Sequence, residues 1–149
     1  MDIRVQSDMF DLGAETQAFA QRQASMGAIV TFSGIVRDTV QGLQAMEIEQ
    51  YPGMTLSQLT KFAEEAKQRF SLGDVLVIHR HGRLIPGDVI MMVATAAPHR
   101  VDAFQAAEYL MDYLKSRAPF WKREITTDGS EAWVEAKSED EDLLSRWGR

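Results

Sequence analysis

Apolar residues recur along the chain with the two periods that distinguish strands from helices. Alternation of apolar and polar positions predicts strands over residues 28–37, 45–51, 74–80, 88–96, 121–126 and 132–136. A period of about 3.6 residues predicts helices over about 55–70 and 99–116, a weaker helix over 10–24 and an acidic one over 139–147. Strands that arrive in pairs between helices favour an α+β fold with a mostly antiparallel sheet.

The two strong helices carry their own boundary signals. Thr55-Leu56-Ser57-Gln58 fits a capping box, in which the Thr55 side chain caps the first turn. The second helix ends before Pro119, and its apolar positions predict one buried stripe made of Val101, Phe104, Ala107, Met111 and Leu114.

Composition limits the class of protein. Across 149 residues, 45% are hydrophobic and 26% are charged, which suits one globular domain over residues 1–149. A net charge of −6 argues against a nucleic-acid partner. No apolar run reaches the roughly 20 residues that a membrane helix needs, and the first residues do not resemble an export signal. We therefore expect a cytoplasmic protein with no membrane partner.

The chain has no cysteine, and this narrows its chemistry. It excludes disulfides, thiolate metal sites and a cysteine nucleophile or persulfide. Any sulfur chemistry would need sulfur brought by another molecule. Among the three histidines, His79 and His81 alternate on one strand without an evident third ligand, so we interpret them as structural or surface residues. We expect no metal and no resident cofactor.

Charge is unevenly distributed. Residues 99–123 hold five basic and three acidic residues, a net charge of +2, whereas residues 124–149 hold eight acids and three bases, a net charge of −5. A basic cluster in an acidic protein indicates a local anion site. The alternative is a solvated helix end, because Lys and Arg favour the last turn of a helix.

The stretch Lys115-Ser-Arg-Ala-Pro-Phe-Trp-Lys-Arg-Glu124 favours the anion site. Phe120 and Trp121 lie beside Lys122, and aromatic neighbours or a second cation lower the pKa of a lysine ammonium. Such a lysine can move protons or hold an oxyanion. In the alternative interpretation the aromatic rings are core residues and the lysines point to water.

Two weaker signals add cations. Ala97-Pro98-His99-Arg100 starts the second helix without a good N-cap, and free N–H groups beside His99 and Arg100 suit a phosphate. Capping by water explains the same pattern. Gly34-Ile-Val-Arg37 adds a cation at a strand end, although a lone arginine on a strand is more often a surface ion-pair partner.

The sequence resembles the MoaE family, the large catalytic subunits of molybdopterin synthase. The likeness covers about residues 27–137, and its most distinctive block is 111–124. The matching motifs are Gly34-Ile-Val-Arg37, Glu49-Gln-Tyr-Pro-Gly-Met54, Ile78-His-Arg80 with Gly82, Pro86-Gly-Asp88, His99-Arg100, Met111-Asp-Tyr-Leu-Lys-Ser-Arg-Ala-Pro-Phe-Trp-Lys-Arg-Glu124 and Trp133-Val-Glu-Ala136.

The resemblance implies a sulfurtransferase of α/β-hammerhead type. It would convert cyclic pyranopterin monophosphate (precursor Z) into molybdopterin, the dithiolene of molybdenum cofactor biosynthesis. The sulfur would come from the C-terminal Gly-Gly thiocarboxylate of a small ubiquitin-like carrier. The resemblance also implies a homodimer that binds one carrier per protomer, a heterotetramer overall.

The resemblance assigns site residues one by one. Lys115 and Lys122 are the expected catalytic residues. The expected substrate-binding residues are Ile35, Val36, Arg37, His99, Arg100, Lys115, Lys122, Arg123 and Glu124. Two other classes compete with this interpretation: an adaptor that merely holds the tail of a ubiquitin-like protein, and an unrelated phosphate-ester enzyme that uses the same basic cluster.

The predicted helix sets a distance between these residues. His99 and Lys115 are 16 positions apart in the sequence, which corresponds to about 24 Å along one helix at 1.5 Å per residue. A pterin phosphate is much shorter than this. We therefore expect His99 and Arg100 of one protomer to complete the pocket that contains Lys115 and Lys122 of the other.

Overall fold

The computed structural model describes residues 1–134 and 138–148. Within these residues the strands are β1 (Asp2–Gln6), β2 (Ala28–Ile35), β3 (Leu43–Gln50), β4 (Asp74–Arg80), β5 (Gly82–Leu84), β6 (Val89–Ala97), β7 (Phe120–Thr126) and β8 (Glu131–Trp133). The helices are α1 (Leu12–Gln21), α2 (Met54–Arg69), α3 (Arg100–Ser116) and α4 (Ser138–Ser145).

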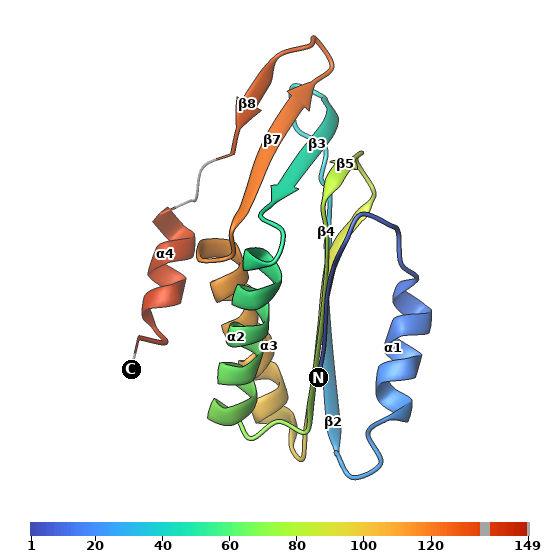
Figure 1. The fold of residues 1–149 in the computed structure, drawn as a ribbon, viewed down its shortest axis with the longest axis vertical. Helices are drawn as coiled ribbons and strands as arrows, with labels where there is room; N and C mark the ends of the chain where they lie inside the picture. Colours follow the sequence, from blue (N-terminus) through green and yellow to red (C-terminus); the bar gives the residue numbers. More distant parts are fainter. Residues whose placement is uncertain (135–137, 149) are drawn as a thin grey trace.

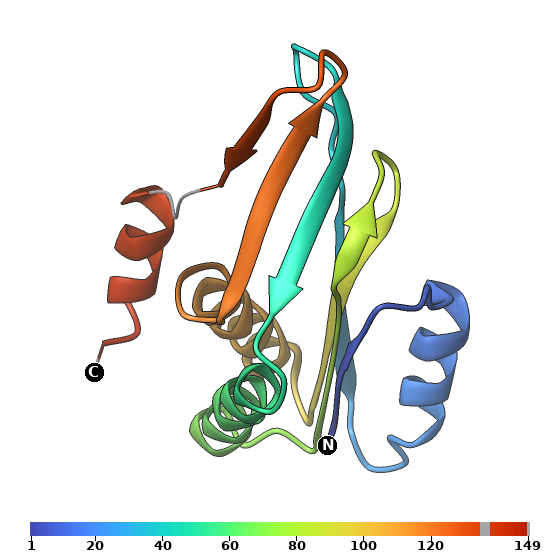
Figure 2. The same cartoon turned by 45° about the horizontal axis from the view of Figure 1, so that its top comes forward.

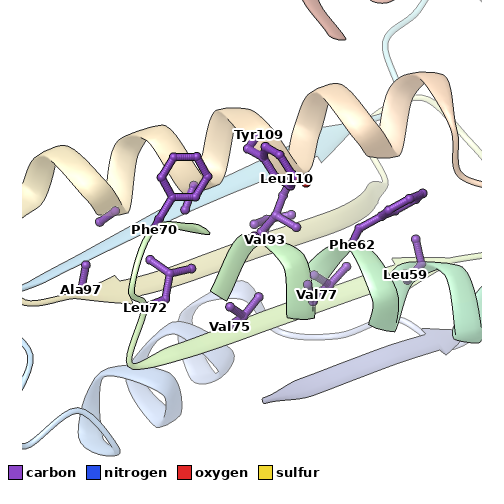
Figure 3. Close-up of a cluster of buried hydrophobic side chains, with 14 of the residues drawn as sticks. Leu59, Phe62, Phe70, Leu72, Val75, Val77, Val93, Ala97, Tyr109 and Leu110 are labelled. Carbon is purple, nitrogen blue, oxygen red and sulfur yellow. The ribbon is translucent and has the colours of Figure 1, made fainter. Parts of the chain in front are cut away.

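The first sheet has the strand order β1-β4-β6-β2, with β2 at one edge. Helices α2 and α3 cover one face of it and α1 covers the other (Figures 1 and 2). Because both faces are covered, every residue of β4 is buried. Figure 3 shows the larger core cluster, in which Leu59 and Phe62 of α2 and Leu110 of α3 pack on Val77 and Val93.

The second sheet has the order β5-β3-β7-β8 and extends beyond the ends of α2 and α3 (Figure 1). Its core cluster consists of Val36, Leu43, Ile48 and Leu84. Ile90 and Phe120 pack against both this cluster and the α2–α3 cluster. These two side chains therefore join the cores of the two sheets, and Phe120 begins the strand that carries Lys122.

The pairing confirms the predicted α+β fold class. Strand β1 runs parallel to β4, and the other strand pairs of the described residues are antiparallel. The predicted elements are present with ends shifted by a few residues, whereas β1 and β5 were not predicted. Residues 135 and 136 of the strand predicted over 132–136 lie outside the described residues.

The predicted capping box at Thr55 is wrong. Helix α2 starts at Met54 after Gly53, and no side chain caps it. Gly53 has a φ of 82°, which glycine adopts without the strain of a Cβ atom. Thr55 therefore lies inside the first turn, fully buried, and its hydroxyl is used for contacts with other parts of the chain.

The predicted buried stripe of α3 is wrong in its first half. Val101 and Phe104 are each 58% exposed, whereas the residues of α3 that are buried are Ala103, Ala106, Ala107, Tyr109, Leu110 and Asp112. The helix places its small alanines against the core, and the larger apolar residues of its first turns lie on another face. Within residues 1–134 and 138–148, no helix is long and apolar enough to cross a bilayer.

Candidate functional site

Lys122 is the most perturbed lysine of the predicted site. It lies on β7 opposite Ile48 of β3. This is the face of the second sheet that carries the core cluster of Val36, Leu43, Ile48 and Leu84. The pKa of its ammonium is lowered from 10.5 to about 8, first by burial and then by the charge of Lys115, with Asp140 opposing both. A lysine with this pKa exchanges its proton readily near neutral pH.

Lys115 lies at the other end of the turn that leads to Lys122. It occupies the last turn of α3 and its side chain is exposed. The chain leaves α3 at Ser116 and enters β7 at Phe120. Two cations thus stand close together at the junction of a helix and a strand, with Lys115 hydrated and Lys122 desolvated.

Alternation along β7 sends neighbouring residues of the predicted site to opposite faces. Arg123 lies opposite Glu47 and Trp133, forms an ion pair with Glu47 and stacks its guanidinium 5.5 Å from the centre of the Trp133 ring. The hydrogen bond to Glu47, followed by the charge of Glu131, raises the pKa of Arg123. The structure therefore separates Arg123 from the face that carries Lys122.

The predicted residues at the end of β2 and just after it lie at the same junction of the two sheets. Val36 is 2% exposed and belongs to the cluster that contains Ile48, whereas Ile35 and Arg37 are exposed. Backbone hydrogen bonds hold Val36 to the turn before β6, because its N–H donates to the carbonyl of Asp88 at 2.8 Å. Glu124, on the Lys122 face of β7, lines a hollow of about 130 Å³.

His99 and Arg100 lie at the far end of α3 from Lys115. His99 is the N-cap of the helix and makes no side-chain cap, and Arg100 is its first residue. Both are exposed. Because α3 is one helix from Arg100 to Ser116, the predicted separation of about 24 Å applies within one chain. A single chain does not gather these two residues and the two lysines around one small ligand.

His79 is a residue of this region whose position the sequence did not predict. It is 4% exposed, its Nδ1 donates to the carbonyl of Arg80 at 2.8 Å, and its ring stacks on Phe120 with centroids 3.8 Å apart. The pKa of the imidazole is lowered to about 3, first by burial and then by the charge of Lys122, with a smaller contribution from Lys115. The signal in the sequence that could have indicated a buried His79 was its place near the end of an otherwise mostly apolar strand.

The described residues contain no cluster of three or more histidine, cysteine or carboxylate side chains arranged for a metal. The chemistry of the arrangement is that of cations and one desolvated amine. It can stabilise negative charge on an oxygen or sulfur atom and can transfer a proton.

Comparison with known proteins identifies the family. The model of the family described as "MoaE protein" matches residues 5–117. The chain belongs to the MoaE family. It is 61% identical over 147 residues to a protein of Cereibacter sphaeroides named "Molybdopterin synthase catalytic subunit", which covers 99% of this chain and 100% of that protein. The family predicted from the motifs is confirmed.

Solved structures have the same fold. The MoaE protein of Burkholderia ambifaria MC40-6 has a TM-score of 0.84 at 53% identity, covering 99% of each chain. A chain from Helicobacter pylori 26695, titled a complex of subunits 1 and 2 of molybdopterin-converting factor, has a TM-score of 0.77 at 18% identity and covers 91% of each chain. At that identity the likeness shows the fold alone.

We predict that His79 makes stability depend on pH. The unfolded chain protonates His79 near its ordinary pKa of 6.5, whereas the folded chain does so only near about 3. The free energy of unfolding therefore falls as the pH drops below 6.5, by up to about 1.4 kcal/mol per unit. Urea unfolding of the wild type should show a loss between about pH 7 and 5 that exceeds the loss for His79→Phe by about 2 kcal/mol. Equal losses in the two proteins would contradict the buried neutral imidazole.

Proposed function

We propose that this chain is the catalytic subunit of a molybdopterin synthase, a sulfurtransferase. A role in molybdenum cofactor biosynthesis follows from its membership of the MoaE family. The observation that carries the chemical proposal is the pair of lysines at the end of α3 and in β7, one hydrated and one desolvated. The substrate is precursor Z, and the cytoplasm is the expected location.

The sulfur donor in this proposal is the C-terminal thiocarboxylate of a small ubiquitin-like carrier. A donor outside the chain is required because the chain has no cysteine. The two-subunit title of the Helicobacter pylori structure supports a partner of this kind. The carrier tail would enter beside Lys115 and Lys122, where the cations stabilise the thiocarboxylate and the oxyanion that forms when sulfur or water attacks.

The remaining cations bind the substrate in this proposal. Arg37 and Arg123, with His99 and Arg100, bind the cyclic phosphate and the pterin oxygens, and Ile35, Val36 and Glu124 line the substrate site. Arg123 lies on the opposite face of β7 from Lys122. It takes this role only if its side chain both leaves Glu47, its ion-pair partner, and reaches the substrate around the strand. Lys122, with its lowered pKa, is the proton donor or acceptor.

The site is shared between two copies of the chain in this proposal. The length of α3 keeps His99 and Arg100 away from Lys115 of the same chain. A surface suited to a second copy is present: Phe32 and Ile35 on the edge strand β2 and Val101 and Phe104 on α3 are between 43% and 58% exposed. A homodimer with one carrier per protomer, a heterotetramer, has two equal sites by two-fold symmetry.

We predict that the purified chain makes molybdopterin from precursor Z only with a thiocarboxylated carrier, since it has no thiol to supply sulfur. The measurement is molybdopterin formation with carriers that end in a thiocarboxylate or in a plain carboxylate. Product formed with the plain carboxylate, and with no other sulfur source, would overturn the proposed function.

We predict that Lys115→Ala and Lys122→Ala each lower the rate by about 100-fold or more, as loss of an oxyanion donor does. Carrier binding should weaken much less, and Lys122→Arg should not restore proton transfer, because a guanidinium stays protonated. Rates are compared under single-turnover conditions, with carrier affinity measured separately. Near-normal rates in both alanine variants would favour the adaptor or a solvated helix end.

We predict that mixed dimers restore activity. Arg100→Ala and Lys115→Ala chains are each expected to be inactive, but a dimer with one chain of each kind keeps one site that contains both residues. The two proteins are mixed under conditions of subunit exchange, and molybdopterin formation is measured before and after. Absence of recovery despite proven exchange would contradict the shared site.

A further inference from the structure

The run from Pro119 to Lys122 is held by a buried hydroxyl from another element. Thr55 of α2 is fully buried. Its Oγ1 accepts a hydrogen bond from the Tyr51 N–H at 3.0 Å and donates one to the Pro119 carbonyl at 3.1 Å. One side chain therefore satisfies two backbone groups that lie 68 positions apart in the sequence and ties the end of β3 to the turn that precedes Lys122.

The same run is held a second time by an aromatic stack. The ring of His79 lies 3.8 Å from the ring of Phe120, centroid to centroid, with 19° between the planes. The hydrogen bond from Nδ1 of His79 to its neighbour's carbonyl orients the imidazole. Phe120 and Lys122 are two residues apart on one strand, so their side chains leave the same face of β7. The stack therefore fixes the position of Phe120, the first residue on the face of β7 that also carries Lys122.

We propose that Thr55 and His79 are positioning residues for the reaction, which hold Lys122 in place through Pro119 and Phe120. The proposal rests on the role given to Lys122 in the proposed function. Neither residue needs to contact substrate. Thr55 sets the backbone of the turn between Lys115 and Lys122, and His79 sets the depth at which β7 enters the junction of the two sheets.

The position of Lys122 matters because the pKa of its ammonium depends on the groups around it. Lys122 is faced by Lys115 from α3, Asp140 from α4 and the neutral ring of His79 from β4. Burial is the largest cause of its lowered pKa, so a looser turn that admits water returns the ammonium toward its ordinary pKa of 10.5. A displacement of about 1 Å at a reacting group also costs about 100-fold in rate.

The first experiment compares Thr55→Val with Thr55→Ser. Valine keeps the shape and removes the hydroxyl, whereas serine keeps the hydroxyl. The folded chain is acylated at a series of pH values, and the extent of acylation of Lys122 is read by mass spectrometry of the peptide that contains it, which gives the pKa of Lys122. The rate of molybdopterin formation is measured in parallel. Thr55→Val should raise the pKa of Lys122 by about one unit and lower the rate about 10-fold or more, and Thr55→Ser should restore both.

The matched control is Thr95→Val. Thr95 is also fully buried, and its hydroxyl donates to the carbonyl of Ala103 at 2.7 Å, near the opposite end of α3. This variant loses the same kind of hydrogen bond, so it should lose similar stability in urea without a change in the pKa of Lys122. An equal shift in the pKa of Lys122 in Thr95→Val would overturn the proposal, because general loosening would then explain the result.

The second experiment tests the stack. His79→Phe keeps an aromatic ring against Phe120 and should leave the rate and the pKa of Lys122 near their wild-type values, whereas His79→Ala should change both as Thr55→Val does. An inactive His79→Phe protein with an unchanged Lys122 pKa would mean that the imidazole itself takes part in the reaction, which contradicts a positioning role.

The outcomes separate this proposal from the proposed function. A pKa of Lys122 that rises in Thr55→Val and His79→Ala supports the positioning, and an unchanged rate in the same proteins would count against the catalytic role of Lys122. Folded Thr55→Val protein in which neither the pKa of Lys122 nor the rate changes would overturn the positioning, whatever the function of the lysine.

Discussion

Desolvation of the Lys122 ammonium is the constraint on which the candidate site depends. A cation loses hydration when apolar groups surround it, and Lys115 adds repulsion that Asp140 offsets only in part. The face of the second sheet on which Lys122 lies is apolar: Ile48 is its neighbour across the strands and belongs to the cluster of Val36, Leu43, Ile48 and Leu84. Phe120, on the same face, connects that cluster with the core under α2 and α3. In the proposed function, the contacts that join the two sheets thus also desolvate the lysine that transfers the proton.

The rigidity of α3 is the second constraint. One unbroken helix carries His99 at its start and Lys115 in its last turn, and a helix does not shorten to bring its ends together. The first turns of the same helix expose Val101 and Phe104 beside the edge strand of the first sheet. Both features favour the proposed site between two chains, because the exposed apolar residues and the distant cations belong to one helix.

Elements with a strong local pattern were predicted well, and the failures have physical reasons. Helix α2 and strand β4 follow from periodicity because each buries a face or both faces along its whole length. Strand β5 has only three residues, and β1 is half-buried throughout, so neither produces a clear alternation. The capping box at Thr55 fitted a local motif, yet the backbone groups of Tyr51 and Pro119 compete for the same hydroxyl.

The sequence by itself determined the types of most elements, the family, the absence of a cysteine that could supply sulfur and the cations around 115–124. These follow from periodicity and motifs, which are properties of short stretches, and from the amino-acid composition of the whole chain. Only the tertiary structure decided that Lys122 is desolvated while Arg123 pairs with Glu47 on the other face. It alone placed the ring of His79 on Phe120 and left Phe104 exposed. The reason is that burial and electrostatic potential are sums over neighbours distant in the chain, and no local pattern contains those neighbours.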